Sequence, residues 1–376
     1  MRFVGMNMRY KLGEICEIVS GSTPKTSIPE YWDGDVKWIT PAELSDDSYI
    51  IEDSVRHITP LGVQKTGLTP FPKGTVILSS RAPIGKVAIA GKEMYCNQGF
   101  KNLICSEVID NRYLYWFLKG NTEYLNSLGR GATFKEISKQ IVAGIELNVP
   151  DIEAQKSAVE VLERVSEIIS LRKKELQRFD ELIKARFVEM FGDPVDNPKG
   201  WEAKRLQELV ADDCTISYGI VQTGDDQEEG IPVFRPVDIV NRVPIRSELK
   251  KTTEEISNKY KRTILKGREM LITVRANIAD TCIVGEEFSG CNVGRGIVPI
   301  RTKENEIILE FLKHQIDSRH LNDKIKALAK GITLIQLNLE DLREVNLIVP
   351  PISEQRAFIE FAEQVDKSKV VQIKAA

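Results

Sequence analysis

The longest regular pattern of apolar and polar positions in the chain lies near its middle, over residues 151–190. This stretch follows Val149-Pro150 and contains neither proline nor glycine, which is typical of a helix. Apolar side chains recur along it every seven residues, and such a repeat indicates the seam of a coiled coil. At 1.5 Å per residue the helix would span roughly 60 Å, so its seam needs a packing partner. The predicted seam positions are Leu162, Ile169, Leu176, Ile183 and Met190.

A second stretch of the same kind follows at an offset of 200 residues. The pattern Val-Pro-x-Ile-x-x-Gln opens both, at residues 149–155 and 349–355. The second run places Ile359 and Ala362 on its apolar side and extends over residues 351–376. It is shorter than the first, so about two turns of the first seam or more lack a partner at 1.5 Å per residue. The chain is then naturally short, truncated, or completed by another copy or by a partner.

The residues before the first predicted helix contain short β-prone runs bounded by turn residues. These runs cover residues 36–40, 74–81 and 86–90. Residues 111–128 then change to helical periodicity, with aromatic side chains on the apolar side. We interpret this half of the chain as a mostly β domain whose sheet is covered by a helix.

Residues 200–348 repeat the plan of the first half. The segments that match, in the same order, are 74–84 with 267–278, 96–100 with 291–296, and 128–133 with 328–333. Matches in one order predict a tandem duplication of a domain followed by a helix. The predicted boundaries are 1–150 for the first domain, 151–192 for the first helix, 193–350 for the second domain and 351–376 for the second helix.

Composition limits the classes of function. The chain has 376 residues, of which 42% are hydrophobic and 28% charged, as is typical of soluble globular protein of about two domains. A net charge of −3 argues against nucleic-acid or membrane binding by bulk charge, so any DNA binding must come from local patches. The six cysteines form no CxxC pair and the three histidines do not join them at ligand spacing, so we expect no metal site and a reduced, cytoplasmic protein. Neither a signal peptide nor a membrane span is predicted.

Motifs that would indicate catalysis by this chain alone are missing. We find no Gly-x-Gly-x-x-Gly after a strand, no Walker pattern and no Asn-Pro-Pro-Tyr type tetrapeptide. We therefore expect a protein that is not an enzyme by itself.

The candidates for contact are instead polar and basic residues in loops beside glycine. Arg81 and Arg275 end matched strands, and arginine is suited to bidentate contact with guanine or phosphate. Arg130 and Lys330 lie in matched glycine-flanked loops that allow close approach to phosphate. The alternative is that these loops only turn the chain and that each arginine pairs with a carboxylate; the matching of the set in both halves favours contact. The candidates are Ser22, Thr23, Lys25, Arg81, Lys86, Asn97, Gln98, Arg130, Thr133, Arg275, Asn277, Asn292, Arg295, Lys330 and Thr333.

Several motifs together resemble a known family, the specificity subunits of type I restriction–modification systems. The resemblance rests on their order and doubling and covers essentially the whole chain. The motifs are Tyr-Lys-Leu-Gly-Glu-Ile at 10–15 with Ser-Gly-Ser-Thr-Pro at 20–24, Tyr-Trp-x-Gly-x-x-x-Trp-Ile at 31–39, Gly-x-Val-Ile-Leu-Ser-x-Arg at 74–81, the two Val-Pro-x-Ile-x-x-Gln runs, and Met-Phe-Gly-Asp-Pro at 190–194 before Gly-Trp at 200–201.

The resemblance implies an α+β fold in which two mostly β target-recognition domains alternate with two long helices that pair as an antiparallel coiled coil. Each domain would read one half of a bipartite, asymmetric site in double-stranded DNA. The helices would set the spacer and dock methyltransferase (M) subunits, and a motor-nuclease (R) subunit would join. This chain would hold no cofactor, because S-adenosylmethionine, ATP and Mg would belong to the partners.

Two alternatives stay open from the sequence. The chain could be the specificity subunit of a stand-alone adenine methyltransferase that has no nuclease. It could also be a coiled-coil scaffold whose domains bind protein, which suits the small net charge but leaves the matched arginine and amide loops unexplained.

Overall fold

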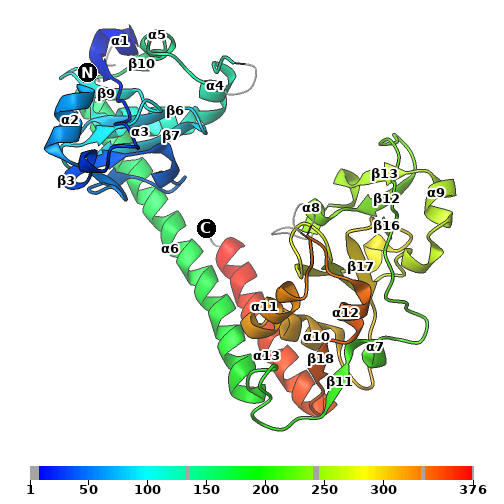
Figure 1. The fold of residues 1–376 in the computed structure, drawn as a ribbon. Coiled ribbons are helices and arrows are strands. Elements are labelled where there is room, and N and C mark those ends of the chain that lie inside the picture. The colour runs from blue at the N-terminus through cyan, green and yellow to red at the C-terminus, as the bar shows by residue number, and fades with distance from the viewer. Residues whose placement is uncertain (1–7, 132–134, 240–244, 332–334, 375–376) are drawn as a thin grey trace, which may run out of the picture. The chain divides into compact units, whose positions relative to one another are not determined.

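The long helix predicted from the seven-residue repeat is present in the computed structural model as α6 (Ile152–Phe191) (Figure 1). The structure describes residues 8–131, 135–239, 245–331 and 335–374. The chain divides into two units, which we call unit 1 (Met1–Leu171) and unit 2 (Arg172–Ala376), so that α6 begins in unit 1 and ends in unit 2. No helix among the described residues is long and apolar enough to cross a membrane.

Unit 1 is built mostly from short strands, as predicted. Its largest sheet has the order β2-β9-β6-β7-β4, a second sheet has the order β5-β3-β8, and β1 pairs with β10. The strands are β1 (Met8–Lys11), β2 (Cys16–Val19), β3 (Trp32–Ile39), β4 (Ile50–Ile51), β5 (His57–Ile58), β6 (Val76–Ser80), β7 (Ile84–Ala90), β8 (Tyr95–Cys96), β9 (Asn102–Cys105) and β10 (Glu146–Val149). The helices before α6 are α1 (Leu12–Ile15), α2 (Pro60–Thr66), α3 (Asn111–Gly120), α4 (Thr122–Ser127) and α5 (Lys139–Ala143).

The helical periodicity predicted over residues 111–128 corresponds to two helices rather than one. The first, α3, ends where the side chain of Asn121 donates a hydrogen bond to the carbonyl oxygen of Phe117 (2.7 Å). Both α3 and α4 pack against β7, and the side chains of Leu114 and Leu118 are buried there. Most aromatic and apolar positions of this segment therefore belong to the core of unit 1, whereas Tyr124 is exposed.

Unit 2 repeats the arrangement of unit 1. Its sheets have the orders β13-β12-β16 and β15-β14-β17, and β11 pairs with β18. The strands are β11 (Ala203–Arg205), β12 (Ile231–Phe234), β13 (Lys250–Thr252), β14 (Glu269–Thr273), β15 (Thr281–Val284), β16 (Asn292–Val293), β17 (Ile297–Ile300) and β18 (Asn346–Ile348). The helices after α6 are α7 (Leu206–Leu209), α8 (Pro236–Ile239), α9 (Glu254–Asn258), α10 (Leu309–Ile316), α11 (Arg319–Ala327), α12 (Leu339–Arg343) and α13 (Ile352–Lys374).

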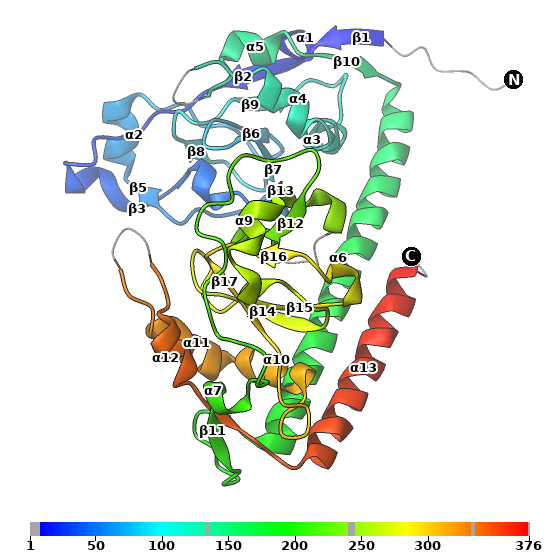
Figure 2. The same cartoon turned by 90° about the vertical axis from the view of Figure 1, so that its right-hand side faces the viewer.

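Helix α13 lies antiparallel beside the C-terminal part of α6 in unit 2 (Figures 1 and 2). The ring of Phe358, near the start of α13, packs on Phe187 with centroids 5.4 Å apart. Near the other end of α13, Lys369 Nζ lies 2.7 Å from Asp180 Oδ1. Ile183 and Ala362 are buried in the same core, and the predicted antiparallel pair is confirmed.

Only part of the predicted seam is covered, as expected from the shorter second run. Met190 and Ile359 pack against the core of unit 2, and Leu176 is half-buried. Leu162 and Ile169, which we placed on the same seam, are 40% and 51% exposed. The reason is length: the ion pair to Asp180 is already near the end of α13 as the structure describes it, and Leu162 and Ile169 lie further along α6.

The glutamine of each Val-Pro-x-Ile-x-x-Gln motif has a structural role. Gln155 and Gln355 are both fully buried although they are polar. In unit 1 the Gln155 amide donates to the carbonyls of Val108 (3.0 Å) and Pro150 (2.8 Å) and accepts from the backbone N–H of Asp110 (2.8 Å). Each glutamine thus joins the start of a long helix to the segment that leads into α3 or α10.

Unit 2 contains the same three hydrogen bonds. The Gln355 amide donates to the carbonyls of Glu306 (3.0 Å) and Pro350 (2.8 Å) and accepts from the N–H of Ile308 (2.9 Å). Replacing Gln355 with leucine should lower the free energy of unfolding of unit 2 by about 2 kcal/mol, because buried polar groups lose their partners. Hydrogen exchange of the α10 amides in urea measures this loss. The matched control, Gln364→Leu on the exposed side of α13, should change little; equal losses for the two variants would contradict the prediction.

His314 of α10 gives unit 2 an acid-sensitive element. Its ring packs edge-on against Phe358, with centroids 5.1 Å apart. Burial, together with the neighbouring charge of Lys313, lowers the pKa of His314 to about 4. A histidine in an unfolded chain has a pKa of about 6.5. Between these two values the unfolded state binds a proton that the folded state does not, so stability is lost as the pH falls from about 6.5 to about 4.

Lowering the pH from 7 to 5 should therefore cost unit 2 about 2 kcal/mol through His314. The variant His314→Leu should lose most of this pH dependence. Hydrogen exchange in α10 at both pH values measures the effect, and exchange in α3 of unit 1 serves as an internal control. An unchanged pH dependence of α10 in the variant would show that another group is responsible.

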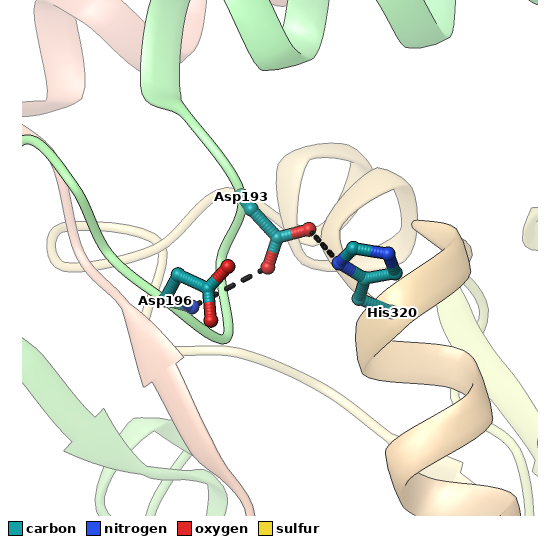
Figure 3. Close-up of side chains that lie close together, drawn as sticks. All are labelled: Asp193, Asp196 and His320. Carbon is teal, nitrogen blue, oxygen red and sulfur yellow. Dashed lines mark hydrogen bonds and ion pairs between the residues drawn. The ribbon is translucent and has the colours of Figure 1, made fainter.

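The segment after α6 is fixed by the residues of the Met-Phe-Gly-Asp-Pro motif. Gly192 ends the helix with a positive φ of 77°, a conformation that glycine adopts at low cost. Asp193 then accepts a hydrogen bond from the N–H of Val195 (2.8 Å), and its other oxygen lies 2.7 Å from Nδ1 of His320 on α11 (Figure 3). The possible ligand atoms of Asp193, Asp196 and His320 lie within 4.8 Å of one another. The hydrogen bonds of Asp193 are sufficient to explain this proximity.

Candidate nucleic-acid interface

The first element of the site is the residue that follows a buried central strand in each unit. Arg81 follows β6, and Arg275 comes two residues after the last residue of β14. The next residue is an alanine with positive φ in both units, 51° for Ala82 and 60° for Ala276. The N–H of the preceding residue donates to a glycine carbonyl in both units, at 2.8 Å. The two arginines therefore occupy equivalent positions.

The second element in each unit is an antiparallel bridge, Arg130 with Glu136 and Lys330 with Gln336, which we call the hairpin of that unit. Backbone hydrogen bonds join Arg130 to Glu136 (3.0 Å) and Lys330 to Gln336 (2.9 Å) in both directions. The residue after each hairpin donates to the carbonyl that precedes Arg81 or Arg275. The hairpin base is thus attached beside the arginine. The predicted contact residues Thr133 and Thr333 lie outside the described residues.

The third element of unit 1 is the loop of residues 20–26. Its backbone is fixed by two tryptophans, because the indole N–H of Trp38 donates to the carbonyl of Ser22 (3.0 Å) and that of Trp32 to the carbonyl of Lys25 (3.2 Å). The hydroxyl of Thr23 donates to the Gln98 side chain (2.6 Å). Ser22 and Lys25 are exposed. This loop and residue 98 therefore form one polar row beside the end of β6.

The corresponding element of unit 2 contains Tyr218 and Arg295. The guanidinium carbon of Arg295 lies 6.0 Å from the centre of the Tyr218 ring. Gly21 lies in the loop of unit 1 and Gly219 follows Tyr218 in unit 2, and a Cβ on either would overlap a backbone carbonyl oxygen, of Cys96 or of Val293. Only glycine allows these close approaches. The sequence signal was a single glycine inside each polar segment, which we did not match.

The structure corrects the predicted match between residues 96–100 and 291–296. In parallel pairing with the neighbouring strand, Cys96 lies opposite Ile39 and Val293 lies opposite Phe234. Cys96-Asn97 and Cys291-Asn292, which we matched by sequence, therefore differ by two positions in the structural alignment of the two units. Gln98 is equivalent to Arg295, and these two remain candidates.

Asn292, in contrast, is not available to DNA. Its side chain is fully buried, donates to the hydroxyl of Ser257 (3.0 Å) and accepts from that of Thr263 (2.7 Å). A buried amide with these partners stabilises the core, so the prediction of DNA contact was wrong.

Other candidates differ in how free their side chains are. The ammonium of Lys86 donates to the carbonyl of Leu44, and Lys330 pairs with Asp341 (3.1 Å). The side chain of Asn97 accepts from the N–H of Gly99 (2.8 Å) and so fixes its own turn. Arg130 and Asn277 are exposed, and Arg130 forms no ion pair with any residue that the structure describes.

Four side chains of the site were missed by sequence reasoning. Glu136 and Gln336 end the two hairpins and contact Arg81 and Arg275. Lys101 is buried beside Glu136, and Tyr218 accepts a hydrogen bond from Gln336 (2.7 Å). Glu136, Gln336 and Lys101 follow matched segments closely in sequence, which was their only signal, whereas Tyr218 had none. The arrangement presents guanidinium, amide and hydroxyl groups, which suit base edges and phosphates.

Comparison with known proteins assigns this arrangement to a family. The family model for the type I restriction modification DNA specificity domain matches residues 6–179 and 198–375. The chain is 32% identical over 374 residues to the type I restriction enzyme MjaIX specificity subunit of Methanocaldococcus jannaschii, over 91% of this chain and 82% of that protein.

Solved structures show the same fold. One, from a study of complex assembly and conformational transition of the type I R-M system, matches 99% of this chain and 93% of its own with a TM-score of 0.55 and 20% identity. The type I restriction–modification S subunit from M. genitalium matches 100% of this chain and 93% of its own with a TM-score of 0.50 and 13% identity. The repeated site, the family model and the similarity to the MjaIX specificity subunit together show that the chain belongs to the family of DNA specificity subunits of type I restriction–modification systems.

Proposed function

We propose that each unit reads one half of a bipartite, asymmetric site in double-stranded DNA. The observation that supports this most directly is that one backbone frame carries different side chains in the two units. An arginine beside a hairpin is common to both, whereas Glu136 and Gln98 of unit 1 are replaced by Gln336 and Arg295 of unit 2. A shared frame with different donors and acceptors suits two related domains that read different bases.

We further propose that α6 and α13 dock M subunits and set the length of the unread spacer. The exposed apolar residues of α6, including Leu162 and Ile169, are suited to a protein partner. An R subunit would join this assembly to cleave DNA. S-adenosylmethionine, ATP and Mg would be bound by those partners, and this chain would recognise DNA in the cytoplasm without catalysing a reaction itself.

Methylation mapping of a host genome by long-read sequencing, with and without this gene, tests the proposal. We expect N6-methyladenine to disappear from one split motif when the gene is deleted. No change in any motif would contradict recognition by this chain.

The family assignment does not favour the two alternatives considered from the sequence. A scaffold that does not bind DNA is tested directly by a salt titration of DNA binding in the presence of the M subunit. Phosphate contacts make log K fall linearly with log salt concentration, so a steep slope supports recognition and absent or flat binding supports the scaffold.

A further inference from the structure

The guanidinium groups of Arg81 and Arg275 are held by different side chains at one matched hairpin position. In unit 1, Glu136 Oε2 lies 3.7 Å from Arg81 Nη1. In unit 2, Gln336 Oε1 accepts from Arg275 Nε at 2.7 Å and also from Nη2. The residue at the position of Glu136 and Gln336 therefore determines which guanidinium nitrogens of the arginine already have a partner.

A second exchange accompanies the first. Lys101 is buried in unit 1, where its ammonium lies 3.2 Å from Glu136 Oε1 and 3.1 Å from the hydroxyl of Ser80. Gly99 and Gly296 are equivalent, because the carbonyl of each accepts from the residue before the arginine. Val298 therefore occupies the position of Lys101, two residues after the glycine. A buried ammonium requires a carboxylate partner, whereas a buried valine does not. Lysine with glutamate in unit 1 thus becomes valine with glutamine in unit 2.

The net charge is +1 in both units, for Arg81, Lys101 and Glu136 in unit 1 and for their equivalents in unit 2. The exchange changes which side chain carries the uncompensated charge. In unit 1 the Glu136 carboxylate is shared between Arg81 and Lys101. In unit 2 the neutral amide of Gln336 leaves the charge of Arg275 uncompensated. The arginine of unit 2 is therefore the better group for a charge-assisted contact with an electronegative base edge.

Gln336 is itself fixed in orientation. Its Nε2 donates to the hydroxyl of Tyr218 at 2.7 Å, which directs Oε1 toward Arg275. The Nε edge of the guanidinium is thus occupied. Among the described residues, Arg275 Nη1 has no hydrogen-bond partner, so the N–H groups of Nη1 and Nη2 remain as a fork. Such a fork matches the O6 and N7 acceptors of guanine in the major groove.

We propose that Gln336 is a positioning residue that orients Arg275 for a bidentate contact with one guanine in the half-site of unit 2. Glu136 binds Arg81 through Nη1 and so gives unit 1 a different base preference at the matched position. This inference rests on the proposed function, because it assigns a base contact to a site that must first bind DNA.

The test uses the complete enzyme with its M subunits and three variants of this chain. Gln336→Leu removes the acceptor that holds Arg275, and Gln336→Glu replaces it with a carboxylate. Gln207→Leu is the control, since Gln207 is an exposed glutamine of α7 outside the site. Methylation mapping first gives the wild-type motif. Duplexes carrying that motif, and each single-base substitution of it, then serve as probes in fluorescence anisotropy.

For Gln336→Leu we expect discrimination to fall about tenfold at one guanine of one half-site, as a lost or misdirected bidentate contact would cause, with the other positions unchanged. For Gln336→Glu we expect weaker binding of that half-site and a salt slope lower by about one, because the carboxylate neutralises Arg275. Gln207→Leu should behave as wild type.

Unchanged discrimination at every position in both Gln336 variants would overturn the inference, as would an equal loss across both half-sites or relaxation at a base other than guanine. If Gln336→Leu does not fold, Gln336→Glu decides alone, because glutamate has nearly the same shape; an unaltered base preference and salt slope would then reject the assignment. A wild-type gene that directs no methylation motif would instead reject the proposed function.

Discussion

Replacing Arg275 with alanine should weaken binding to the half-site of unit 2 by about ten- to a hundredfold, the value of one good bidentate contact with a base. Recognition of the other half-site should be unchanged, because Arg81 of unit 1 belongs to a separate hydrogen-bonded frame. The loss should be concentrated at the base pair whose discrimination Gln336 controls. Anisotropy titrations with duplexes altered in one half-site at a time measure it.

Two further variants complete this experiment. Arg81→Ala should produce the mirror result, with loss confined to the half-site of unit 1. Arg319→Ala removes an arginine whose side chain is 90% exposed and which lies outside the site, so it controls for a general loss of positive charge. A loss of equal size on both half-sites in Arg275→Ala would mean that the two units do not read DNA independently.

Regular periodicity made the helices predictable. The repeat over residues 151–190 differs from the observed α6 by one residue at each end, because proline before it and glycine after it limit a helix strongly. The predicted strand at 74–81 likewise contains β6, and the predicted strand at 86–90 lies within β7, which begins two residues earlier. Which turns of α6 are covered depended instead on the extent of α13. The shorter second run predicted that part of the seam lacks a partner, and the exposed Leu162 and Ile169 lie in that part.

The same limit applied to the site. Arg81 and Arg275 could be matched because each follows an apolar strand that has a clear pattern. Asn292 could not be distinguished from an exposed asparagine, because its burial depends on Ser257 and Thr263, which are distant in sequence. Sequence identity of two short Cys-Asn pairs gave a register two positions out, whereas backbone pairing gave the correct one.

Glu136 and Gln336 illustrate what only the structure supplies. As single letters they are ordinary polar residues at the end of a loop. Their meaning comes from contacts across the sheet, with Lys101 in one unit and with Tyr218 in the other. In a duplicated domain each copy can be compared with the other. A contact that differs between two otherwise equivalent backbones is then easy to recognise.

Inserting a second copy of residues 168–174 directly after Lys174 should lengthen the unread spacer of the DNA site by about three base pairs. Seven residues add roughly 10 Å to a helix, and successive base pairs are about 3.4 Å apart. Because α6 is one uninterrupted helix from Ile152 to Phe191, and seven residues preserve its apolar repeat, the insertion should extend the helix without altering either reading site. The original site should then lose about a thousandfold in affinity, approaching non-specific binding, since its half-sites are no longer correctly spaced.

Methylation mapping of a host that carries the lengthened gene gives the new spacer directly, with both half-site sequences retained. The control is the same seven residues inserted after Glu228, in an exposed loop of unit 2 that is not part of the helix pair; this variant should keep the original spacer. If the lengthened α6 still methylates the original motif, the helix does not determine the spacing. The exposed apolar side chains of α6 would then serve partner binding alone, and the spacing would have to be set by how the partners hold the two units.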